Sequence, residues 1–396
     1  MAASLKFVIS VVALVCLSLL GAFAQGASTP HYVMTNDDAC GIACFQPSNG
    51  VTFYTVGANG FLKLKQQVPL SATGIGGGYF GMNRLTVVNS GGQQCVYASE
   101  AADGVIEGVN ISTLTLGGKA SGSESDAGTS NGIGLVTNGQ YIYASFSDSN
   151  TVGTFQIQPG CSLTFVNDVS VGGLQNGVID AMAVRGNILV ATYGDGSIES
   201  FNISAGTPQS NGDKQNSTAA IADQGATYPS AVDITQDGHF AIFGDTSTSD
   251  VVEVSDISSG MLMKTVAYRS VVGISSSNLM LSPDETLLYV INTQGDQISA
   301  AFFNKNNGSF SHGCSSGLLK NYVSGWSYLS GMAMATNTGN GGAVYVAEFG
   351  NPGSIAMIKV SSSGATCTLA EGTGSPISDP NSPGLLSVTG FPPRSF

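Results

Sequence analysis

The chain has 396 residues, of which only 10% are charged, 42% are hydrophobic and 53 are glycine. This composition favours strands and turns, because long helices need more alanine, leucine, glutamate and lysine, and disordered chains hold fewer hydrophobic residues. The formal net charge of −13 repels phosphate backbones and anionic headgroups, so we expect neither nucleic acid nor a membrane surface as a partner.

The first segment has the pattern of an export signal. Lys6 provides a positive start, Phe7 to Leu20 is an apolar run, and Ala22 to Ala24 gives the small–x–small pattern of a cleavage site. The run is too short to span a bilayer and no second apolar segment follows it, so we expect a signal peptide over residues 1–24 and no membrane span. The protein is then secreted, periplasmic or extracellular. A lipoprotein anchor at Cys16 is the alternative.

One strand pattern recurs seven times after the signal. Each copy has an aromatic or aliphatic residue, then small or β-branched residues, then a polar turn. The copies begin at Tyr32, Tyr97, Tyr143, Val190, Phe240, Tyr289 and Tyr345. Their spacing of roughly 45–65 residues is typical of a β-propeller, in which each blade takes about 40–50 residues.

Each copy has similar neighbours along the chain. A small apolar strand precedes it, such as Ile133 to Val136, and an alternating strand follows it, such as Gly50 to Val56 or Thr151 to Ile157. A further strand comes next, such as Ser162 to Val171. We therefore expect four antiparallel strands in each blade, with the recurring run as the second.

The two ends of the chain are predicted to complete one blade. The repeat begins at Tyr32 with a second strand and lacks a first, whereas Leu385 to Thr389 is a spare first strand. A shared blade removes an open sheet edge that would promote aggregation. We therefore predict one all-β domain over residues 25–396, a seven-bladed β-propeller whose C-terminal strand completes the N-terminal blade. A β-sandwich and a β-solenoid are the alternatives.

Six cysteines remain after residue 24, and an even number in an exported chain predicts three disulfides. The candidates are Cys40, Cys44, Cys95, Cys161, Cys314 and Cys367. Six cysteines allow fifteen pairings, and the sequence does not choose among them. No CxxC motif occurs and the histidines do not cluster with the cysteines, so we expect no zinc site.

The sequence resembles two related groups of propellers. Tyr32 to Asn36 reads YVMTN, and Leu281 to Asn292 reads LSPDETLLYVIN. These runs are similar to the repeat core of YVTN-type propellers, which are WD40-like repeats, and of lactonase-like propellers related to bacterial 6-phosphogluconolactonase. The resemblance covers nearly the whole chain after the signal. It implies the propeller fold, while activity does not follow from fold alone.

The resemblance also implies the place at which a lactonase would act. Enzymes of this type place a histidine beside a proline just before a first strand, with arginine and acidic residues in the same cleft. The corresponding stretch here runs from Tyr228 to Asp233, keeps the proline as Pro229 and has no histidine. We therefore expect a lactonase-like fold without a clear catalytic signature.

Candidate binding residues follow from the predicted topology. The connections between blades and the turns from second to third strand share one end of the ring, named here the loop-bearing end, where ligands usually bind. Arg84 and Arg269 are expected in connections between blades and can hold a carboxylate or a phosphate. Tyr79, Trp326 and Tyr328 are expected in two such connections and can stack on a sugar or a peptide.

Acidic residues recur after the second strands, and two of them, Asp245 and Glu348, are candidate ligand-binding residues. The full set is Asp37, Asp38, Glu100, Asp103, Asp148, Asp195, Asp245 and Glu348. A ring of carboxylates at the channel mouth suits Ca²⁺ or a cationic ligand. The alternative is that these side chains bond the backbone of their own turns. No stretch has the spacing of a Ca²⁺ loop, so we expect no cofactor and no metal.

The three histidines are predicted to lie away from the loop-bearing end. His31 and His239 begin second strands, and His312 lies near a turn between third and fourth strands. A histidine-based acid–base mechanism would therefore lack its residue at that end.

The expected function is that of an exported propeller binding a small molecule, a carbohydrate or a protein at its mouth. One alternative is a hydrolase of a lactone or sugar acid, similar to 6-phosphogluconolactonase, that uses Arg84, Arg269 and one acidic residue. Another is a cell-surface or extracellular matrix component. Whether the protein is an enzyme stays open, and its catalytic residues are not identified.

Overall fold

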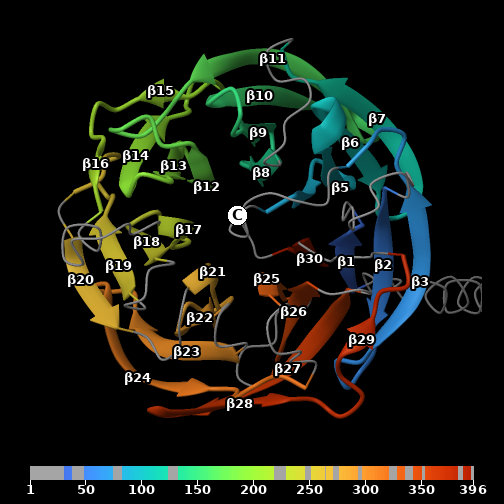
Figure 1. Ribbon diagram of the computed structural model, residues 1–396, viewed down its shortest axis with the longest axis vertical. Helices are drawn as coiled ribbons and strands as arrows, with labels where there is room; N and C mark the ends of the chain where they lie inside the picture. The colour runs from blue at the N-terminus through green and yellow to red at the C-terminus, as the bar shows by residue number, and fades with distance from the viewer. Residues whose placement is uncertain are drawn as a thin grey trace, which may run out of the picture. The chain divides into compact units, whose positions relative to one another are not determined.

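The computed structural model arranges antiparallel sheets as blades around one axis (Figure 1), and seven sheets occur in the described part of the chain. The residues that the structure describes are 31–37, 49–74, 83–123, 133–217, 229–245, 251–263, 265–270, 276–292, 297–320, 328–334, 342–349, 353–381 and 387–393. We number the blades 1 to 6 from β4 onward and name the sheet β30-β1-β2-β3 the closing blade.

Strand order is the same in every blade, from the axis outward. The first, innermost strands are β4 (Leu85–Ser90), β8 (Ile133–Thr137), β12 (Ile179–Arg185), β17 (Pro229–Ile234), β21 (Ser276–Leu281), β25 (Tyr328–Ala333) and β30 (Ser387–Phe391). The second strands are β5 (Gln93–Glu100), β9 (Tyr141–Phe146), β13 (Ile188–Tyr193), β18 (Phe240–Asp245), β22 (Leu287–Asn292), β26 (Ala343–Phe349) and β1 (Tyr32–Asn36).

The outer half of each blade completes this order. The third strands are β6 (Val105–Asn110), β10 (Thr151–Gln158), β14 (Ser197–Asn202), β19 (Val251–Asp256), β23 (Gln297–Asn304), β27 (Ser354–Ser363) and β2 (Gly50–Val56). The outer strands are β7 (Thr115–Ser121), β11 (Ser162–Ser170), β15 (Gln209–Ser210) with β16 (Gln215–Asn216), β20 (Thr265–Ser270), β24 (Ser309–Ser315), β28 (Thr366–Glu371) with β29 (Ile377–Ser378), and β3 (Leu62–Pro69). Short 3₁₀ turns occur at η1 (Ala101–Asp103) and η3 (Pro159–Cys161).

The position of a strand in its blade explains its sequence. Every residue of β22 is buried, because both faces of a second strand pack against neighbouring blades. In β3 only Leu62 and Val68 are buried, and the intervening residues are polar or exposed. Second strands therefore read as continuous hydrophobic runs, and these runs are the recurring pattern of the sequence.

The predicted closure of the ring is confirmed. Strand β30 pairs antiparallel with β1, with Tyr32 opposite Phe391 and Asn36 opposite Ser387. The strand begins at Ser387, two residues later than the predicted start at Leu385, which lies outside the described residues. The N-terminal strand thus has a paired neighbour on each side and leaves no open edge at the axis.

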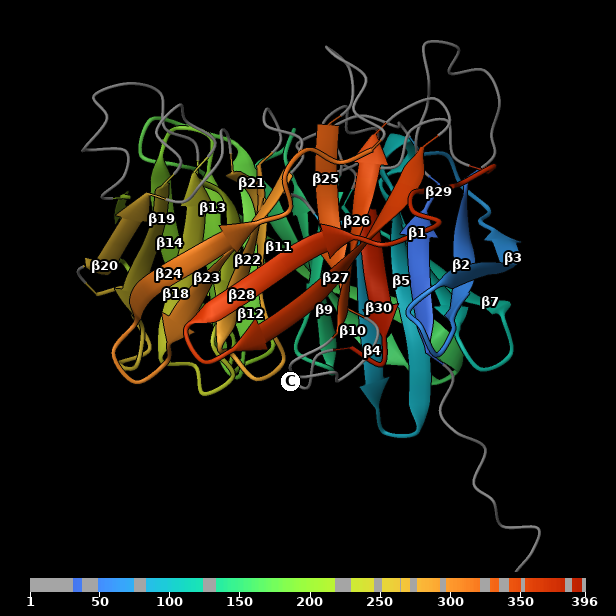
Figure 2. The same ribbon diagram turned by 90° about the horizontal axis from the view of Figure 1, so that it is seen from below.

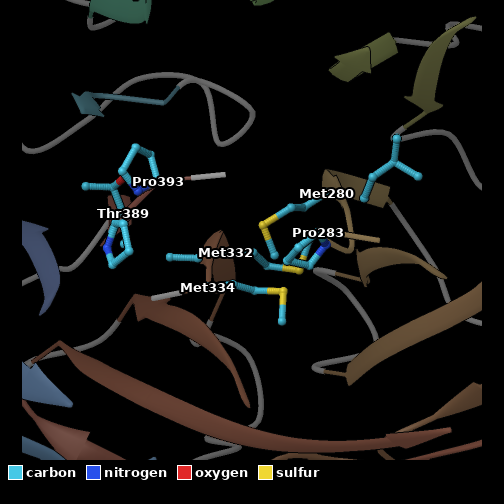
Figure 3. Close-up of a pocket in the computed structure, with 10 residues that line it drawn as sticks. Met280, Pro283, Met332, Met334, Thr389 and Pro393 are labelled. Carbon is cyan, nitrogen blue, oxygen red and sulfur yellow. The ribbon is translucent and has the colours of Figure 1, made fainter. Parts of the chain in front are cut away.

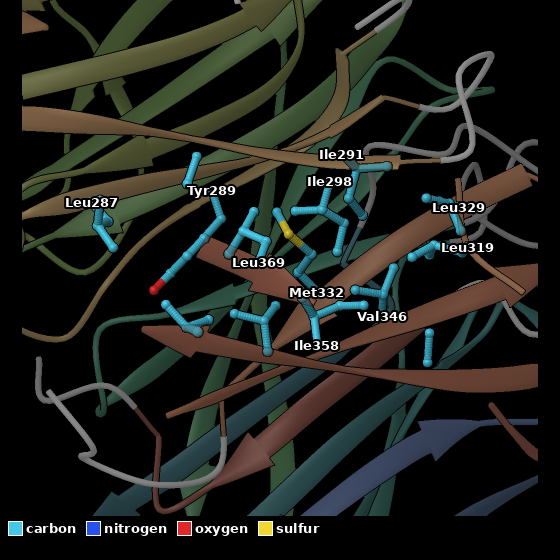
Figure 4. Close-up of a cluster of buried hydrophobic side chains, with 14 residues drawn as sticks. Leu287, Tyr289, Ile291, Ile298, Leu319, Leu329, Met332, Val346, Ile358 and Leu369 are labelled. Carbon is cyan, nitrogen blue, oxygen red and sulfur yellow. The ribbon is translucent and has the colours of Figure 1, made fainter. Parts of the chain in front are cut away.

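Hydrophobic clusters fill each interface between adjacent blades. Between blades 5 and 6, Tyr289 and Ile298 pack with Val346 and Ile358, all at most 2% exposed (Figure 4). Burial of one such side chain contributes about 1.5–3 kcal/mol. Equivalent clusters join the other blades, including the closing blade with blades 1 and 6, so the hydrophobic interior is a closed ring.

Two disulfides link neighbouring blades. Cys95 of blade 1 is bonded to Cys161 of blade 2, and Cys314 of blade 5 is bonded to Cys367 of blade 6. These are two of the three disulfides predicted from the number of cysteines. Cys40 and Cys44 lie outside the described residues, so their bond stays a prediction.

The ring has two different ends, which are seen from the side in Figure 2. One is the loop-bearing end. The other, named here the hairpin end, carries the turns from first to second and from third to fourth strands, such as the turn between β4 and β5. Among the described residues no helix has the length and apolar character needed to cross a membrane.

Candidate functional site

A cavity of ≈ 230 Å³ lies on the axis of the ring, named here the axial cavity, and residues from the first strands of all seven blades line it. Most of the lining residues are apolar, and polar atoms contribute about as much of the cavity surface as apolar atoms. The polar lining residues are Asn83, Thr86, Thr137, Arg185, Asp233, Asn278 and Thr389. A lining of mainly apolar residues with a few polar groups is usual for a small-molecule site. Such sites commonly measure about 300–1,000 Å³, so the axial cavity suits a compact ligand.

Two half-buried charged residues of neighbouring blades line the axial cavity. Arg185 is the last residue of β12, and Asp233 lies near the end of β17. The carboxylate of Asp233 accepts hydrogen bonds from the backbone N–H of Ile234 at 2.8 Å and of Leu281 at 2.9 Å. Because Leu281 belongs to the next blade, these bonds fix the carboxylate at the cavity wall. A guanidinium and a carboxylate on adjacent strands can together orient a polar ligand.

A second cavity of ≈ 170 Å³, named here the methionine cavity, lies at the hairpin end and shares four lining residues with the axial cavity. Met280, Met332 and Met334 line it, with Pro283 and Pro393 (Figure 3). Its wall is formed by β21, β25, β30 and the residues directly after these strands, so it is built from blades 5, 6 and the closing blade.

The loop-bearing end holds a buried pair of carboxyl groups where the closing blade meets the segment that follows β29 of blade 6. Asp37 and Asp379 are 2% and 0% exposed. Asp37 accepts hydrogen bonds from the Thr52 hydroxyl at 2.7 Å and the Gln67 amide at 2.6 Å, and the Thr35 hydroxyl donates to Asp379 at 2.8 Å. Burial, followed by repulsion from Asp379, raises the pKa of Asp37 to about 8. Burial also raises the pKa of Asp379.

A second carboxyl pair lies between the closing blade and blade 1. Glu100 accepts hydrogen bonds from the Ala72 backbone N–H at 2.5 Å and the Asn49 side chain at 3.1 Å, and Glu107 accepts one from the Ser71 N–H at 2.7 Å. Burial, followed by the neighbouring Glu107, raises the pKa of Glu100 to about 8. Both glutamates are at most 4% exposed, so neither is presented to a ligand in solution.

Several acidic residues after second strands hold backbone segments in place. Besides Glu100, Asp103 accepts the Thr73 N–H at 2.7 Å, Asp195 accepts the Gln175 and Gly177 N–H groups, and Glu348 accepts the Ser354 hydroxyl. The backbone N–H groups that donate to Glu100, Asp103 and Asp195 lie in the segments that precede the first strands of the same blades. These contacts favour the structural interpretation of the acidic residues over a ring of ligating carboxylates. Asp38 and the side chain of Asp245 lie outside the described residues.

The two arginines of the predicted clamp lie in different parts of the ring. Arg84 directly precedes β4, in a connection between blades as expected, and is 1% exposed. Its backbone N–H donates to the Ser387 hydroxyl at 3.0 Å, and its backbone carbonyl accepts the Ser99 N–H at 3.0 Å. Arg269 lies within β20, the outer strand of blade 4, because the strand continues to Ser270. The prediction that Arg269 lies in a connection between blades was therefore wrong. Arg84 belongs to blade 1 and Arg269 to blade 4, so the two arginine backbones are three blades apart.

The predicted aromatic residues fall mostly beyond the description. Tyr79 and Trp326 lie outside the described residues. Tyr328 is the first residue of β25, and its side chain lies outside the description as well. Their binding role stays a prediction.

The histidines lie where the sequence placed them. His31 and His239 directly precede β1 and β18 at the hairpin end, and His312 lies in the outer strand β24. His239 is 3.4 Å from Asp256 between Nε2 and Oδ2. Neither cavity includes a histidine among its lining residues.

Sequence reasoning missed Arg185 and Asp233 as site residues. Asp233 entered the sequence analysis only as the end of the stretch that keeps Pro229 and lacks a histidine. The available signal was a charged residue within or at the end of a short apolar first strand, since inner strands face the channel. The contribution of several distant strands to one cavity could not be read from one segment.

A family model described as "Lactonase, 7-bladed beta-propeller" matches residues 96–380. No curated protein matches the sequence. A candidate 6-phosphogluconolactonase from Bacteroides fragilis has a similar structure, with a TM-score of 0.63 and 15% identity over 92% of this chain and 99% of that one. The periplasmic gluconolactonase of Pseudomonas aeruginosa gives a TM-score of 0.56 and 17% identity over 72% of this chain and 83% of that one. A protein of unknown function from Desulfotomaculum acetoxidans gives 0.58 and 11%, over 86% and 98%. At such identities the structural likeness concerns the fold.

Proposed function

This chain belongs to the lactonase family of seven-bladed β-propellers, and we propose that it is an exported protein that binds a compact polar ligand in its axial cavity. The observation that carries the proposal is the cavity of ≈ 230 Å³, to which all seven first strands contribute and into whose wall Arg185 and Asp233 are built. The ligand class is a sugar-derived lactone or the corresponding sugar acid, since two of the structural relatives are named for such substrates.

Export is supported by two independent features. The segment from Lys6 to Ala24 has the pattern of a cleavable signal. The bonds Cys95–Cys161 and Cys314–Cys367 are stable in oxidising compartments. We expect the secreted form to begin at Gln25, which N-terminal sequencing of protein recovered from the medium or periplasm measures. Retention of residues 1–24 in that protein would contradict the proposed cleavage.

Binding is tested by filling the axial cavity. In Val184→Phe the added ring occupies the cavity from β12, while Val166→Phe places the same ring on the outer strand β11, where the valine is 45% exposed. We expect calorimetric titration with glucono-1,5-lactone and with gluconate to give binding to the wild type and to Val166→Phe, and at least tenfold weaker binding to Val184→Phe. Equal binding by all three proteins, or none by the wild type, would overturn the proposal.

Lactone hydrolysis is the second candidate function, favoured by family membership and by the charges in the axial cavity. The Asp233 carboxylate would take a proton from water as it attacks the lactone carbonyl, and Arg185 would stabilise the oxyanion. The tetrahedral intermediate would then collapse with breakage of the ring C–O bond, and Asp233 would return the proton to the leaving ring oxygen, which becomes the hydroxyl of the sugar acid. The test is the initial rate of glucono-1,5-lactone opening above the uncatalysed rate, measured by acid release. We expect Asp233→Asn to lower that rate at least a hundredfold, and Lys63→Met on the exposed face of β3 to leave it unchanged. Binding without turnover in the wild type would leave the binding function and remove the enzymatic one.

A further inference from the structure

Three methionines of two adjacent blades line the methionine cavity at the hairpin end. Met280 lies in β21 of blade 5, Met332 in β25 of blade 6, and Met334 directly after β25. All three line one cavity of ≈ 170 Å³. Figure 3 shows their thioether sulfurs on the same side of the cavity.

Strand geometry brings these side chains together. Met332 is the fifth residue of β25 and Met334 follows the strand directly, and both line the cavity. Strands β21 and β25 are the innermost strands of neighbouring blades, which brings Met280 to the same wall. Met332 is 7% exposed and the other two are half-buried, so the sulfurs are screened from bulk water yet border the channel.

Methionine is concentrated around the axis. Of the chain's 10 methionines, four line the axial cavity or the methionine cavity, namely Met182, Met280, Met332 and Met334. Methionine commonly fills irregular gaps in a core. Here, however, an open volume remains between the side chains. Met332 belongs to the cluster between blades 5 and 6 and Met280 and Met334 pack against it, so the three side chains both fill this interface and border the cavity.

The chemistry of the wall is selective. Apart from the thioethers, the only side-chain donor among the lining residues is the hydroxyl of Thr389, since the others are Leu281, Pro283, Ala333, Gly390, Pro392 and Pro393. Such a wall lacks the carboxylates and imidazoles that hold Mg²⁺, Ca²⁺ or Zn²⁺. Thioethers are soft ligands that select Cu(I). A net charge of −13 also favours the approach of a cation.

We propose that Met280, Met332 and Met334 form a Cu(I) site at the hairpin end of the channel, with the three thioether sulfurs as ligands. The site adjoins the axial cavity, whose wall also includes Met280 and Met332, but it uses neither Arg185 nor Asp233 and does not depend on the proposed binding of a sugar-derived ligand. Copper enters and leaves as Cu(I), so binding involves no change of oxidation state.

The site is tested by anaerobic competition for Cu(I) between the purified mature protein and the chromophoric chelator bicinchoninate. The test variant carries Met280→Leu, Met332→Leu and Met334→Leu, which nearly conserve side-chain volume and remove the sulfurs. The control variant carries Met261→Leu and Met263→Leu, two methionines 41% and 50% exposed on a turn of blade 4. All proteins keep the same cysteines, so differences between them report on the thioethers.

We expect one Cu(I) per chain in the wild type and in the control variant, and at least tenfold weaker binding in the triple variant. X-ray absorption at the copper edge should show a shell of sulfur ligands that disappears in the triple variant, and Zn²⁺ should not compete. If the triple variant unfolds, as judged by its thermal transition, the single variant Met334→Leu is measured in its place and should weaken binding in the same direction. Wild-type-like affinity in the folded triple variant, or no Cu(I) bound by the wild type, would overturn the proposal.

Discussion

The pKa values of two aspartates at opposite ends of the ring are shifted in opposite directions. At the hairpin end, Asp256 accepts hydrogen bonds from the Ser258 hydroxyl at 2.6 Å and N–H at 2.8 Å, which lower the pKa of its carboxyl. At the loop-bearing end, Asp37 is 2% exposed beside Asp379, and its pKa is raised to about 8. Asp37 also accepts several hydrogen bonds, so burial and a second carboxyl outweigh them.

The difference follows from where the chain closes the ring. Asp37 directly follows β1, whereas Asp379 follows β29 in the C-terminal segment, and Thr35 of β1 donates to Asp379. The two carboxyls thus meet only when the two ends of the chain come together. The turn at Asp256 is local and needs no distant partner. The hairpin end is therefore organised mainly by short-range contacts, and this part of the loop-bearing end by long-range ones.

The largest expected effect comes from breaking a link near the hairpin end. Replacing Cys95 and Cys161 by serine opens a loop of 66 residues between blades 1 and 2. We expect the free energy of unfolding to fall by about 4 kcal/mol, because the unfolded chain regains the entropy of that loop. Denaturant titration measures the loss. It should be the same at pH 5 and pH 8, and a loss that varies strongly with pH would contradict the separation of the two ends.

The next largest effect is a pH dependence of the free energy of unfolding that arises in the closing blade. The pKa of Asp37 is raised in the folded state, so its protonated form stabilises the fold fully below about pH 4, and this contribution is lost as pH rises toward about 8. We expect a loss on the order of 3 kcal/mol between pH 5 and pH 9 from this region. Denaturant titration across that range tests it. Stability that rises steadily from pH 5 to pH 9 would contradict it.

A single substitution should flatten this dependence. In Asp379→Asn the amide oxygen can still accept the Asn381 N–H, and the Thr35 hydroxyl can accept from the new NH₂ group. Burial, the larger cause, remains, but with the charge of Asp379 removed the pKa of Asp37 falls and the dependence of stability on pH should become shallower. Asp284→Asn at the hairpin end is the matched control and should leave the slope unchanged. An unchanged slope in Asp379→Asn would show that the two carboxyls do not interact.

The smallest effect is expected at the hairpin end. Asp256→Ala removes the two hydrogen bonds with Ser258 and should lower stability by about 1 kcal/mol at pH 7. Because the pKa of Asp256 is lowered by folding, this contribution is present above about pH 4 and lost as pH falls further. The difference in thermal midpoint between wild type and variant should therefore not grow from pH 6 to pH 9. A difference that grows toward pH 9 would contradict the local nature of this turn.

Local patterns predicted the strands and their order. Tyr32 to Asn36 and Gly50 to Val56 agree with β1 and β2 residue for residue, because alternation and turn residues act within one segment. The site was predicted less well. Arg269 was expected in a connection but lies in an outer strand, since the point at which a polar outer strand ends is weakly marked in the sequence.

The sequence by itself determined the number of blades, the order of strands within them and the closure by the C-terminal strand. These follow from period, alternation and an unpaired first strand, all of which can be read along the chain. Tertiary structure alone decided which cysteines pair, which carboxyls remain protonated and which side chains line the axis. Asp37 faces Asp379, and Arg185 and Asp233 border one cavity with residues of five other blades. Such groupings depend on residues brought together by ring closure, and neither their burial nor their neighbours are encoded in any one segment.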